Sequence, residues 1–272
     1  MARLRSLEQA AAWIDEVGVA LLFPSGDYVL PSLWEAVAGN PEVDWSIRDE
    51  EGKYVAFTPN MRKVWSWKDE LPAGRLACVG LHVARTSSLV APRLVASLYA
   101  ATAEGRDGID GLELEIEQAV ESLGRPADRR ELRLLVGAEK RHADRAINAL
   151  QRKLVLTNAG LTDEGSGWAS TLHDLFARRW KAKLRRLPAR EDALDALAAA
   201  VLRGGGEVSA ADLGAALRLR KRETVETLER LEAKQLAARF RRDGLQLWSA
   251  PAPGSTARSR AAGSRSSPRR SR

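Results

Sequence analysis

The stretch that decides the fold is residues 220–249, which read RKRETVETLERLEAKQLAARFRRDGLQLWS. From Arg220 to Gln235 the apolar residues recur every three or four positions, a spacing that predicts an amphipathic helix. Two strand-like runs, Leu236–Arg242 and Leu245–Ser249, then flank Asp243-Gly244, the dipeptide that two-residue hairpins prefer. A helix followed directly by a hairpin is typical of the last part of a winged helix-turn-helix unit.

The same pattern occurs earlier in the chain. Aligning the sequence with itself at an offset of 81 residues, without a gap, places apolar residues on apolar residues: Ile116 on Leu197, Val120 on Val201, Leu132 on Leu213, Ile147 on Leu228 and Leu150 on Leu231. A repeat of this kind indicates that both segments have the same fold. We therefore expect three helices and a hairpin in each copy, which is the winged-helix order.

Glycines and capping residues mark the helix ends within both copies. In the first copy, Gly124 ends the first helix, Asp128 caps the second, and the third helix extends from Glu139 to about Lys153. In the second copy, the run from Gly204 to Gly206 stops the first helix and Ser209 starts the second. Both copies therefore predict helices at equivalent positions.

The predicted fold is mainly α with small β hairpins, an α+β class with tandem winged helix-turn-helix domains after an N-terminal α+β unit. The expected boundaries are residues 1–105 for the N-terminal unit, 106–187 for the first winged helix with a linking helix, 188–250 for the second, and 251–272 for a disordered basic tail. The linking helix is expected from Arg178 to Arg186, which holds six basic groups and no acid.

The N-terminal third has a mixed pattern and five of the eight tryptophans. The elements expected there are a helix at Leu7–Val17, a strand at Val19–Phe23, a helix opened by Pro31 in its first turn, a long loop or ribbon from Asn40 to Asn60, a strand at Leu76–Ala84 and a helix at Pro92–Ala103. Trp65 and Trp67 alternate with polar residues, which favours a half-buried strand that packs both rings into the core. The alternative is a base-stacking platform with Lys68, Asp69 and Glu70 as acid and base groups.

Basic residues recur at the start of the third helix in both copies, where a recognition helix contacts base edges. The candidate nucleic-acid contacts are Lys140, Arg141, Arg145, Arg152, Arg179, Arg218, Arg220, Lys221, Arg222, Arg239, Arg241 and Arg242. The alternative is an ordinary solvated helix face or a protein-docking module, because Glu223, Glu226, Glu229 and Glu232 neutralise much of the second candidate helix.

The formal net charge of +7 is carried almost entirely by the tail. Residues 1–250 have a net charge of only +1, whereas residues 251–272 hold six arginines and no acid. A tail built of Pro, Gly, Ser, Ala and Arg predicts disorder and non-specific attraction to polyanions. The case for nucleic-acid binding by the folded part therefore rests on where its cations lie.

Other classes of site are disfavoured by composition. Cys78 is the only cysteine, so an intramolecular disulfide and a cysteine-built zinc site are impossible, and we read Cys78 as a buried core residue. We expect no metal and no cofactor, because the sequence has no phosphate-binding glycine loop and no ligand cluster. No apolar run is long enough for a membrane span, which predicts a cytoplasmic protein without a membrane partner, with association with the nucleoid as an option that stays open.

Several motifs resemble a known family. At Leu22-Phe-Pro24, Leu30–Ala36 and especially Trp65–Pro72, the chain resembles bacterial proteins related to the AlkZ-type winged-helix DNA glycosylases. The resemblance extends over most of residues 10–185, and more loosely over the second winged helix. It implies a tandem winged-helix architecture, a duplex-DNA partner and a link to DNA repair.

The catalytic motif of those glycosylases is missing. They carry a Gln-apolar-Gln triplet that positions the attacking water. In this chain no two glutamines have a single residue between them, since they lie at Gln9, Gln118, Gln151, Gln235 and Gln246. We therefore expect a non-enzymatic winged-helix protein that binds duplex DNA. Two alternatives stay open: a DNA glycosylase that acts on alkylated or crosslinked bases by a non-standard motif, and a winged-helix protein-interaction module.

Overall fold

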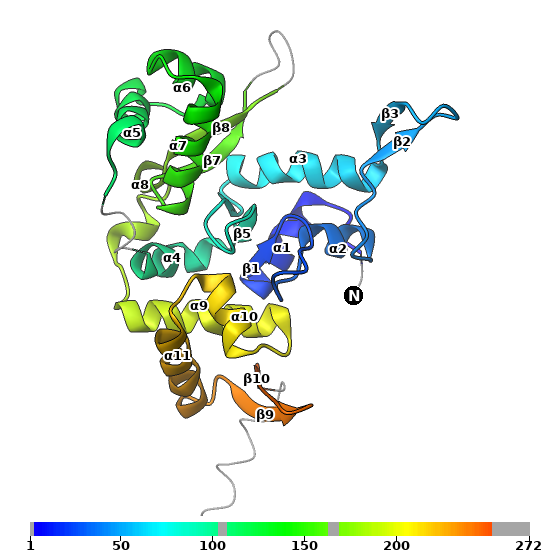
Figure 1. Cartoon of the computed structure of the whole chain (residues 1–272), viewed down its shortest axis with the longest axis vertical. Helices are drawn as coiled ribbons and strands as arrows, with labels where there is room; N and C mark the ends of the chain where they lie inside the picture. The colour runs from blue at the N-terminus through cyan, green and yellow to red at the C-terminus, as the bar shows by residue number, and fades with distance from the viewer. Residues whose placement is uncertain (1–2, 103–107, 163–168, 252–272) are drawn as a thin grey trace, which may run out of the picture.

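A computed structural model describes residues 3–102, 108–162 and 169–251. Along these residues helices alternate with short strands, and the named strands pair antiparallel in small sheets. The chain is therefore an α+β protein, as the sequence predicts. Figure 1 shows residues 108–162 at one end of the molecule and residues 190–250 at the other, with much of residues 3–102 beside and between them. Residues 252–272 of the tail predicted at 251–272 lie outside the described residues.

The N-terminal region is built around a small buried sheet. Its elements are α1 (Leu7–Val17), β1 (Val19–Leu21), α2 (Leu33–Ala38), β2 (Ser46–Arg48), β3 (Tyr54–Phe57), α3 (Pro59–Ala73), β4 (Cys78–Gly80), β5 (Ser88–Val90), the 3-10 turn η1 (Pro92–Leu94) and α4 (Val95–Ala101). The sheet has the order β1-β5-β4, and every residue of its strands is buried. β1 and β4 lie inside the strands that the sequence predicts, and η1 with α4 occupies the predicted helix that starts at Pro92.

The start of α2 corrects the prediction for Pro31. Ser32 Oγ accepts a hydrogen bond from the Glu35 amide at 3.1 Å, and a Glu35 carboxylate oxygen accepts one from the Ser32 amide at 3.1 Å. This reciprocal capping box fixes Ser32 as the residue before the first turn. Pro31 therefore lies outside the helix.

The prediction of a strand around Trp65 and Trp67 is wrong, because this segment is the helix α3. Its buried face includes Met61, Val64, Trp67 and Leu71, which recur at helical spacing. Thr58 Oγ1 accepts a hydrogen bond from the Met61 amide at 3.2 Å and so caps the helix. The two tryptophans consequently have different environments: Trp67 is buried, whereas Trp65 is 41% exposed.

The segment expected to be a loop or ribbon contains the β2–β3 hairpin, which projects from the body (Figure 1). Apolar side chains are exposed along it, and the most exposed are Trp45, Ile47, Tyr54 and Val55. Trp45 connects the hairpin to the body, because its ring lies 5.0 Å from that of Phe23.

The two copies of the predicted repeat contain matching helices. They are α5 (Gly111–Leu123), α6 (Arg129–Leu135) and α7 (Lys140–Arg152) in the first copy, and α9 (Arg190–Gly205), α10 (Ala210–Leu217) and α11 (Lys221–Ala233) in the second. α6 and α10 begin 81 residues apart, as do α7 and α11. The offset found in the sequence therefore describes the positions of these helices.

A hairpin follows the third helix in each copy. The first combines β7 (Leu156–Leu161) and β8 (Thr171–Leu175) with the short β6 (Ala127–Asp128) in a sheet of order β6-β8-β7. The second pairs β9 (Ala238–Arg242) with β10 (Leu245–Ser249). The predicted turn between them is confirmed, because Asp243 and Gly244 have the left-handed φ values of 51° and 80° that a type I′ turn requires. Residues 163–168, part of the predicted first wing, lie outside the described residues.

The expected linking helix between the copies is two separate pieces, α8 (Phe176–Arg179) and the 3-10 turn η3 (Lys183–Arg185). Trp180 ends α8 with φ −107° and is 4% exposed. Its indole belongs to the hydrophobic core that also contains Phe176. A continuous basic helix from Arg178 to Arg186 is therefore not formed.

The second repeat and the N-terminal region share one hydrophobic core. This cluster joins residues of β1, β4 and α4 to residues of α9, α10 and α11, whereas the inward faces of α5, α6 and α7 form a separate cluster. Close packing requires glycine in α9, since a Cβ at Gly205 would lie 2.6 Å from the Val29 carbonyl oxygen. The prediction that the run from Gly204 to Gly206 stops this helix is confirmed, because α9 ends at Gly205 and Gly206 is its C-cap.

Candidate nucleic-acid interface

The start of α7 presents three exposed cations. Lys140, Arg141 and Arg145 are exposed, while Ala143 and Ile147 on the same helix are buried in the core of the first repeat. The amphipathic pattern of the sequence thus turns the apolar residues inward and the cations toward solvent. Within the described part of the chain, none of the three cations forms an ion pair.

A concave surface adjoins this helix start. Arg129, Arg130 and Arg133 of α6 line it together with Lys140, around a cavity of about 410 Å³. Arg129 is fixed in place, because it donates to Asp144 Oδ1 at 3.0 Å and to Asn148 Oδ1 at 2.7 Å. The other three cations form no ion pair among the described residues. The α6–α7 surface therefore has an excess of positive charge.

A second group of cations meets where the N-terminal region contacts both repeats. Arg218 ends α10, and its Nη1 donates to the carbonyl oxygen of Arg152 at the end of α7, at 3.3 Å. Arg85 approaches from the loop between β4 and β5. Burial lowers the pKa of Arg218 from its usual value, and the positive charges of Arg85 and Arg152 lower it further. We call Arg85, Arg152 and Arg218 the junction arginines.

Two cavities flank Arg218. The smaller, of about 280 Å³, is lined by Arg152, Lys153 and Arg190 as well as by apolar side chains. The larger, of about 640 Å³, is lined by Arg85 and Lys221. The sequence prediction contained Arg152, Arg218 and Lys221 but no other cation of these two cavities.

A buried histidine closes one side of the smaller cavity. His82 is 4% exposed; its Nδ1 donates to the carbonyl oxygen of Gln151 at 2.8 Å, and its Nε2 lies 3.3 Å from Thr157 Oγ1. Burial lowers the pKa of His82 to about 4. The imidazole is therefore neutral at pH 7 and joins the β4–β5 loop to α7.

Cys78 contacts the same threonine, with Sγ 3.7 Å from Thr157 Oγ1. Burial raises the pKa of the thiol to about 12, so it is protonated at neutral pH and unreactive as a nucleophile. The prediction that Cys78 is a buried core residue is confirmed.

In the second repeat, several predicted contact residues have acidic partners. Arg222 Nε lies 2.7 Å from Glu226 Oε1, Arg239 Nε lies 3.2 Å from Glu232 Oε2, and Arg242 pairs with Glu207. Arg220, Lys221 and Arg241 are exposed and form no ion pair among the described residues. The glutamates that the sequence analysis expected to neutralise much of the charge of α11 thus form specific ion pairs, including those of Glu226 and Glu232.

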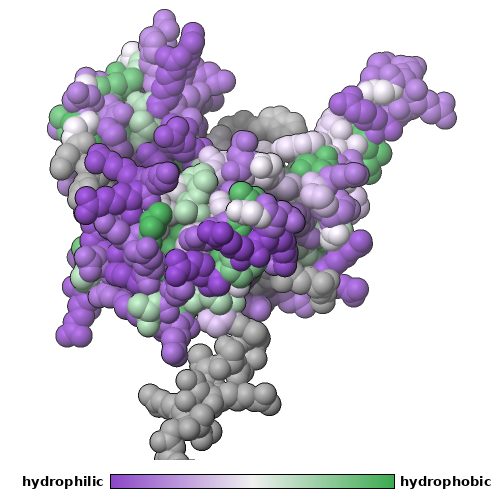
Figure 2. Space-filling view, turned by 60° about the horizontal axis from the view of Figure 1, so that its bottom comes forward, coloured by the Kyte–Doolittle hydropathy of each residue, from purple (hydrophilic) through white to green (hydrophobic). Residues whose placement is uncertain are grey.

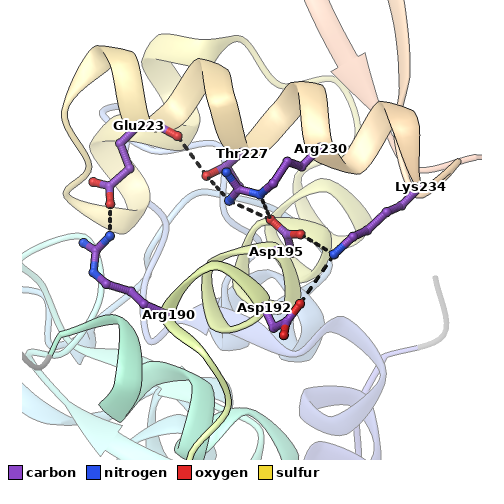
Figure 3. A network of polar contacts seen from close by, with 7 residues as sticks. All are labelled: Arg190, Asp192, Asp195, Glu223, Thr227, Arg230 and Lys234. Carbon is purple, nitrogen blue, oxygen red and sulfur yellow. Dashed lines mark hydrogen bonds and ion pairs between the residues drawn. The ribbon is translucent and has the colours of Figure 1, made fainter.

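Other charges of α11 attach it to α9 (Figure 3). Asp195 is 4% exposed; its carboxylate accepts hydrogen bonds from Arg230 Nε at 3.0 Å and from Lys234 Nζ at 2.8 Å. Arg190, the first residue of α9, pairs with Glu223 of α11. This network holds the two helices together and leaves few uncompensated cations on α11, in contrast to α7.

Arg179 has a structural environment. Its Nη2 donates to the carbonyl oxygen of Ala73 at 2.9 Å and also to that of Pro72, both at the end of α3. Burial and the charge of Arg75 lower its pKa from the usual value. A guanidinium at the C-terminal carbonyls of a helix satisfies groups that the helix itself leaves without donors.

The segment Trp65–Asp69 places an exposed aromatic ring beside a buried acid. Lys68 Nζ lies 4.6 Å from the centre of the Trp65 ring and pairs with the Asp69 carboxylate, which also accepts a hydrogen bond from Thr171 at 3.1 Å. Asp69 is 2% exposed, and burial raises its pKa from the usual value. The ring of Trp65 also neighbours those of Trp45 and Phe57.

Two further findings concern the described residues as a whole. No helix among them is both long and apolar enough to cross a membrane. No group of three or more His, Cys, Asp or Glu side chains among them is arranged to hold a metal ion. Figure 2 shows one face of the molecule, on which hydrophilic residues surround separate, smaller hydrophobic areas.

These observations define an α+β protein with a three-helix repeat and two concentrations of surface cations. The chain belongs to the AlkZ-related family, whose model matches residues 4–217. A similar solved structure is the DNA glycosylase AlkZ of Streptomyces sahachiroi, with a TM-score of 0.54 and 13% identity. That similarity covers 89% of this chain and 64% of the glycosylase, so this chain matches less than two thirds of its length. A comparison with curated proteins gives no match.

Proposed function

We propose that this protein binds duplex DNA through two winged-helix units, and that α7 of the first unit is the principal recognition helix. The observation that carries the proposal is the start of α7, where Lys140, Arg141 and Arg145 are exposed without acidic partners among the described residues. Arg130 and Arg133 of α6 extend this surface for phosphate contacts. The fold shared with a DNA glycosylase supports DNA as the partner.

The second unit has a smaller part in this proposal. Arg222, Arg239 and Arg242 would have to exchange a carboxylate partner for phosphate, which reduces the gain in free energy from each contact. Arg220, Lys221 and Arg241 form no ion pair within the described part of the chain and are therefore suited to contact the DNA backbone. We assign them to phosphate positioning, and Arg179 to support of α3.

The test is a salt titration of duplex binding by residues 1–250, with full-length protein for comparison, since the arginine tail binds polyanions without sequence preference. Replacement of Lys140 and Arg141 by Ala should weaken binding by about 1 kcal/mol or more, and reduce the slope of log K against log salt by about 2. The matched control replaces Lys53 and Arg62, two exposed cations of the N-terminal region. Equal losses in both variants, or no binding by residues 1–250 at low salt, would refute the role of α7.

A glycosylase reaction is a second candidate, and the observation that favours it is Asp69 beside Trp65. An acid of raised pKa next to an exposed aromatic ring resembles a site that holds an extruded base near an acid or base group. The assay is release of an alkylated base with formation of abasic sites. Activity that Asp69→Asn abolishes, with duplex affinity unchanged, would support this function; activity that survives the substitution would exclude Asp69 from it.

A protein-interaction role is favoured by the β2–β3 hairpin, which exposes Trp45, Tyr54 and Val55. Residues 42–53 hold five acids and two bases, so this ribbon is repelled by phosphate and suited to a protein surface. Replacing Tyr54 and Val55 by Ser should leave DNA affinity unchanged. A loss of DNA affinity in this variant would contradict the assignment of the hairpin to a protein partner.

A further inference from the structure

The junction arginines come from three parts of the chain that meet only through folding. Arg85 lies in the loop after β4, Arg152 at the end of α7, and Arg218 at the end of α10. The loop is held against α10, because the Ala84 amide donates to the carbonyl oxygen of Ala216 at 3.0 Å. Arg218 shares the smaller cavity with Arg152 and the larger one with Arg85, so it lies between the other two arginines.

The backbone is strained at two of the junction arginines. Arg85 and Arg218 have left-handed φ values of 53° and 59°, and Ala84 precedes Arg85 with 54°. A non-glycine residue in this conformation is strained, and glycine is the usual residue at a helix end such as that of α10. Backbone strain at a charged residue that lines a cavity is typical of a binding site.

The three guanidinium groups form no ion pair among the described residues. Arg218 donates to a carbonyl oxygen, and the Nε of Arg152 is buried without a hydrogen-bond partner in the described part of the chain. The acids nearest to the smaller cavity have other partners: Glu223 pairs with Arg190, and Glu113 accepts from Lys153 at 2.6 Å. Three positive charges therefore lie near one another without a paired acid among the described residues. A bound anion would offset their mutual repulsion and could accept a hydrogen bond from Arg152 Nε.

We propose that Arg85, Arg152 and Arg218 form a phosphate-binding site between the two cavities. Guanidinium forks match the oxygen geometry of phosphate, and three of them suit a dianion better than a monovalent carboxylate. The phosphate can belong to the DNA backbone or to free inorganic phosphate. The site does not depend on the role of α7 as a recognition helix, because Arg152 lies at the opposite end of α7 from Lys140 and Arg141, and the other two arginines lie outside this helix.

Phosphate in this position would stabilise the fold by joining the β4–β5 loop, α7 and α10. The first measurement is thermal unfolding of the full chain in inorganic phosphate and in sodium chloride at equal ionic strength. At phosphate concentrations about tenfold above Kd, the proposal predicts a rise in Tm of about 3 °C beyond that in chloride. An equal Tm in the two salts would refute the site.

The variant Arg218→Gly removes one guanidinium and supplies the residue that favours the left-handed backbone there. The folded protein should therefore keep or increase its Tm in chloride, and lose most of the increment in phosphate. Arg141→Ala, at the far end of α7, is the control and should retain the full increment. If Arg218→Gly responds to phosphate as the parent does, the anion binds elsewhere and the proposal is wrong.

Duplex binding then separates the two sources of phosphate. If a backbone phosphate occupies the site, Arg218→Gly lowers duplex affinity about 5-fold and reduces the salt slope by about 1. If only free phosphate occupies it, duplex affinity is unchanged while the thermal increment is lost. Failure of the α7 proposal would be recognised independently, because the Lys140 and Arg141 double variant would then bind DNA normally.

Discussion

Acidification should destabilise this protein through its two buried histidines. His82 and His173 are 4% and 1% exposed, and burial lowers their pKa values to about 4 and about 3. His82 also borders the cavity of Arg152 and Arg218, where a further positive charge is unfavourable. Both ring nitrogens of His173 lack a hydrogen-bond partner among the described residues. Protonation therefore favours the unfolded chain at both sites.

The direction follows from the difference in bound protons. A histidine in the unfolded chain has a pKa of about 6.5, so between pH 6.5 and pH 4 the unfolded state binds a proton that folded His82 does not. Stability due to the neutral imidazole is present above pH 6.5 and declines as the pH falls toward 4. From pH 7 to pH 5 the loss is about 2 kcal/mol for each histidine, and about 4 kcal/mol for both.

The assay is urea unfolding at pH 7 and pH 5, at constant ionic strength, followed by tryptophan fluorescence. His82→Gln and His173→Gln should each lower stability at pH 7 but reduce the additional loss at pH 5 by about 2 kcal/mol relative to the parent. His142→Gln is the matched control, because the His142 side chain is 61% exposed. Equal pH sensitivity in the parent and both buried variants would refute the assignment of the loss to these residues.

Three other substitutions test local features of the fold by urea unfolding at pH 7. Gly80→Ala places a Cβ 2.5 Å from His82 Nε2 and should lower the free energy of unfolding by about 2 kcal/mol. Gly26→Ala is the control, because a Cβ there meets no atom within 4 Å, and it should change stability little. Equal effects of the two substitutions would contradict the predicted clash with His82. Ser209→Ala removes the capping box of α10 and should cost about 1 kcal/mol, and a neutral result would show that the cap contributes nothing. Asp195→Ala leaves the cations in Figure 3 without their buried acid and should cost about 2 kcal/mol; no loss would indicate that solvent replaces it fully.

The local features were predictable because short sequence patterns determine them. The Asp243-Gly244 turn depends on two adjacent residues that tolerate left-handed backbone, and the structure has both of them there. Ser209 caps α10 through Asp212, three residues away. The repeat was predictable for a related reason, since the core positions of one copy fall on apolar positions of the other at a constant offset.

The error at α3 shows how a short window misleads. Trp65-Ser-Trp67 alternates like a strand, but the helical period becomes visible only from Met61 to Leu71. The pattern of three residues gave equal environments to both tryptophans. The longer pattern separates them, with Trp67 on the buried face and Trp65 exposed beside the hairpin.

The junction could not be predicted from the sequence, because its residues are distant along the chain. Arg152 and Arg218 are 66 positions apart, and no local rule brings either of them to Arg85. The ion pairs likewise include some that local sequence spacing predicts and others that only the fold brings together. The pairing of Arg222 with Glu226 follows from their four-residue helical spacing, whereas the pairing of Arg242 with Glu207 requires the fold.

The arrangement of charge, more than its sum, decides how this protein could meet DNA. Residues 1–250 are nearly neutral, yet uncompensated cations gather on the α6–α7 surface and at the junction, while residues 42–53 are acidic. Figure 1 shows α6 and α7 on one side of the molecule and the β2–β3 hairpin on the other. A polyanion would attract the first side and repel the second, so the field orients the protein before contact. This distribution of charge would set the orientation of the protein toward a polyanion, whereas a uniformly basic surface would only increase its affinity.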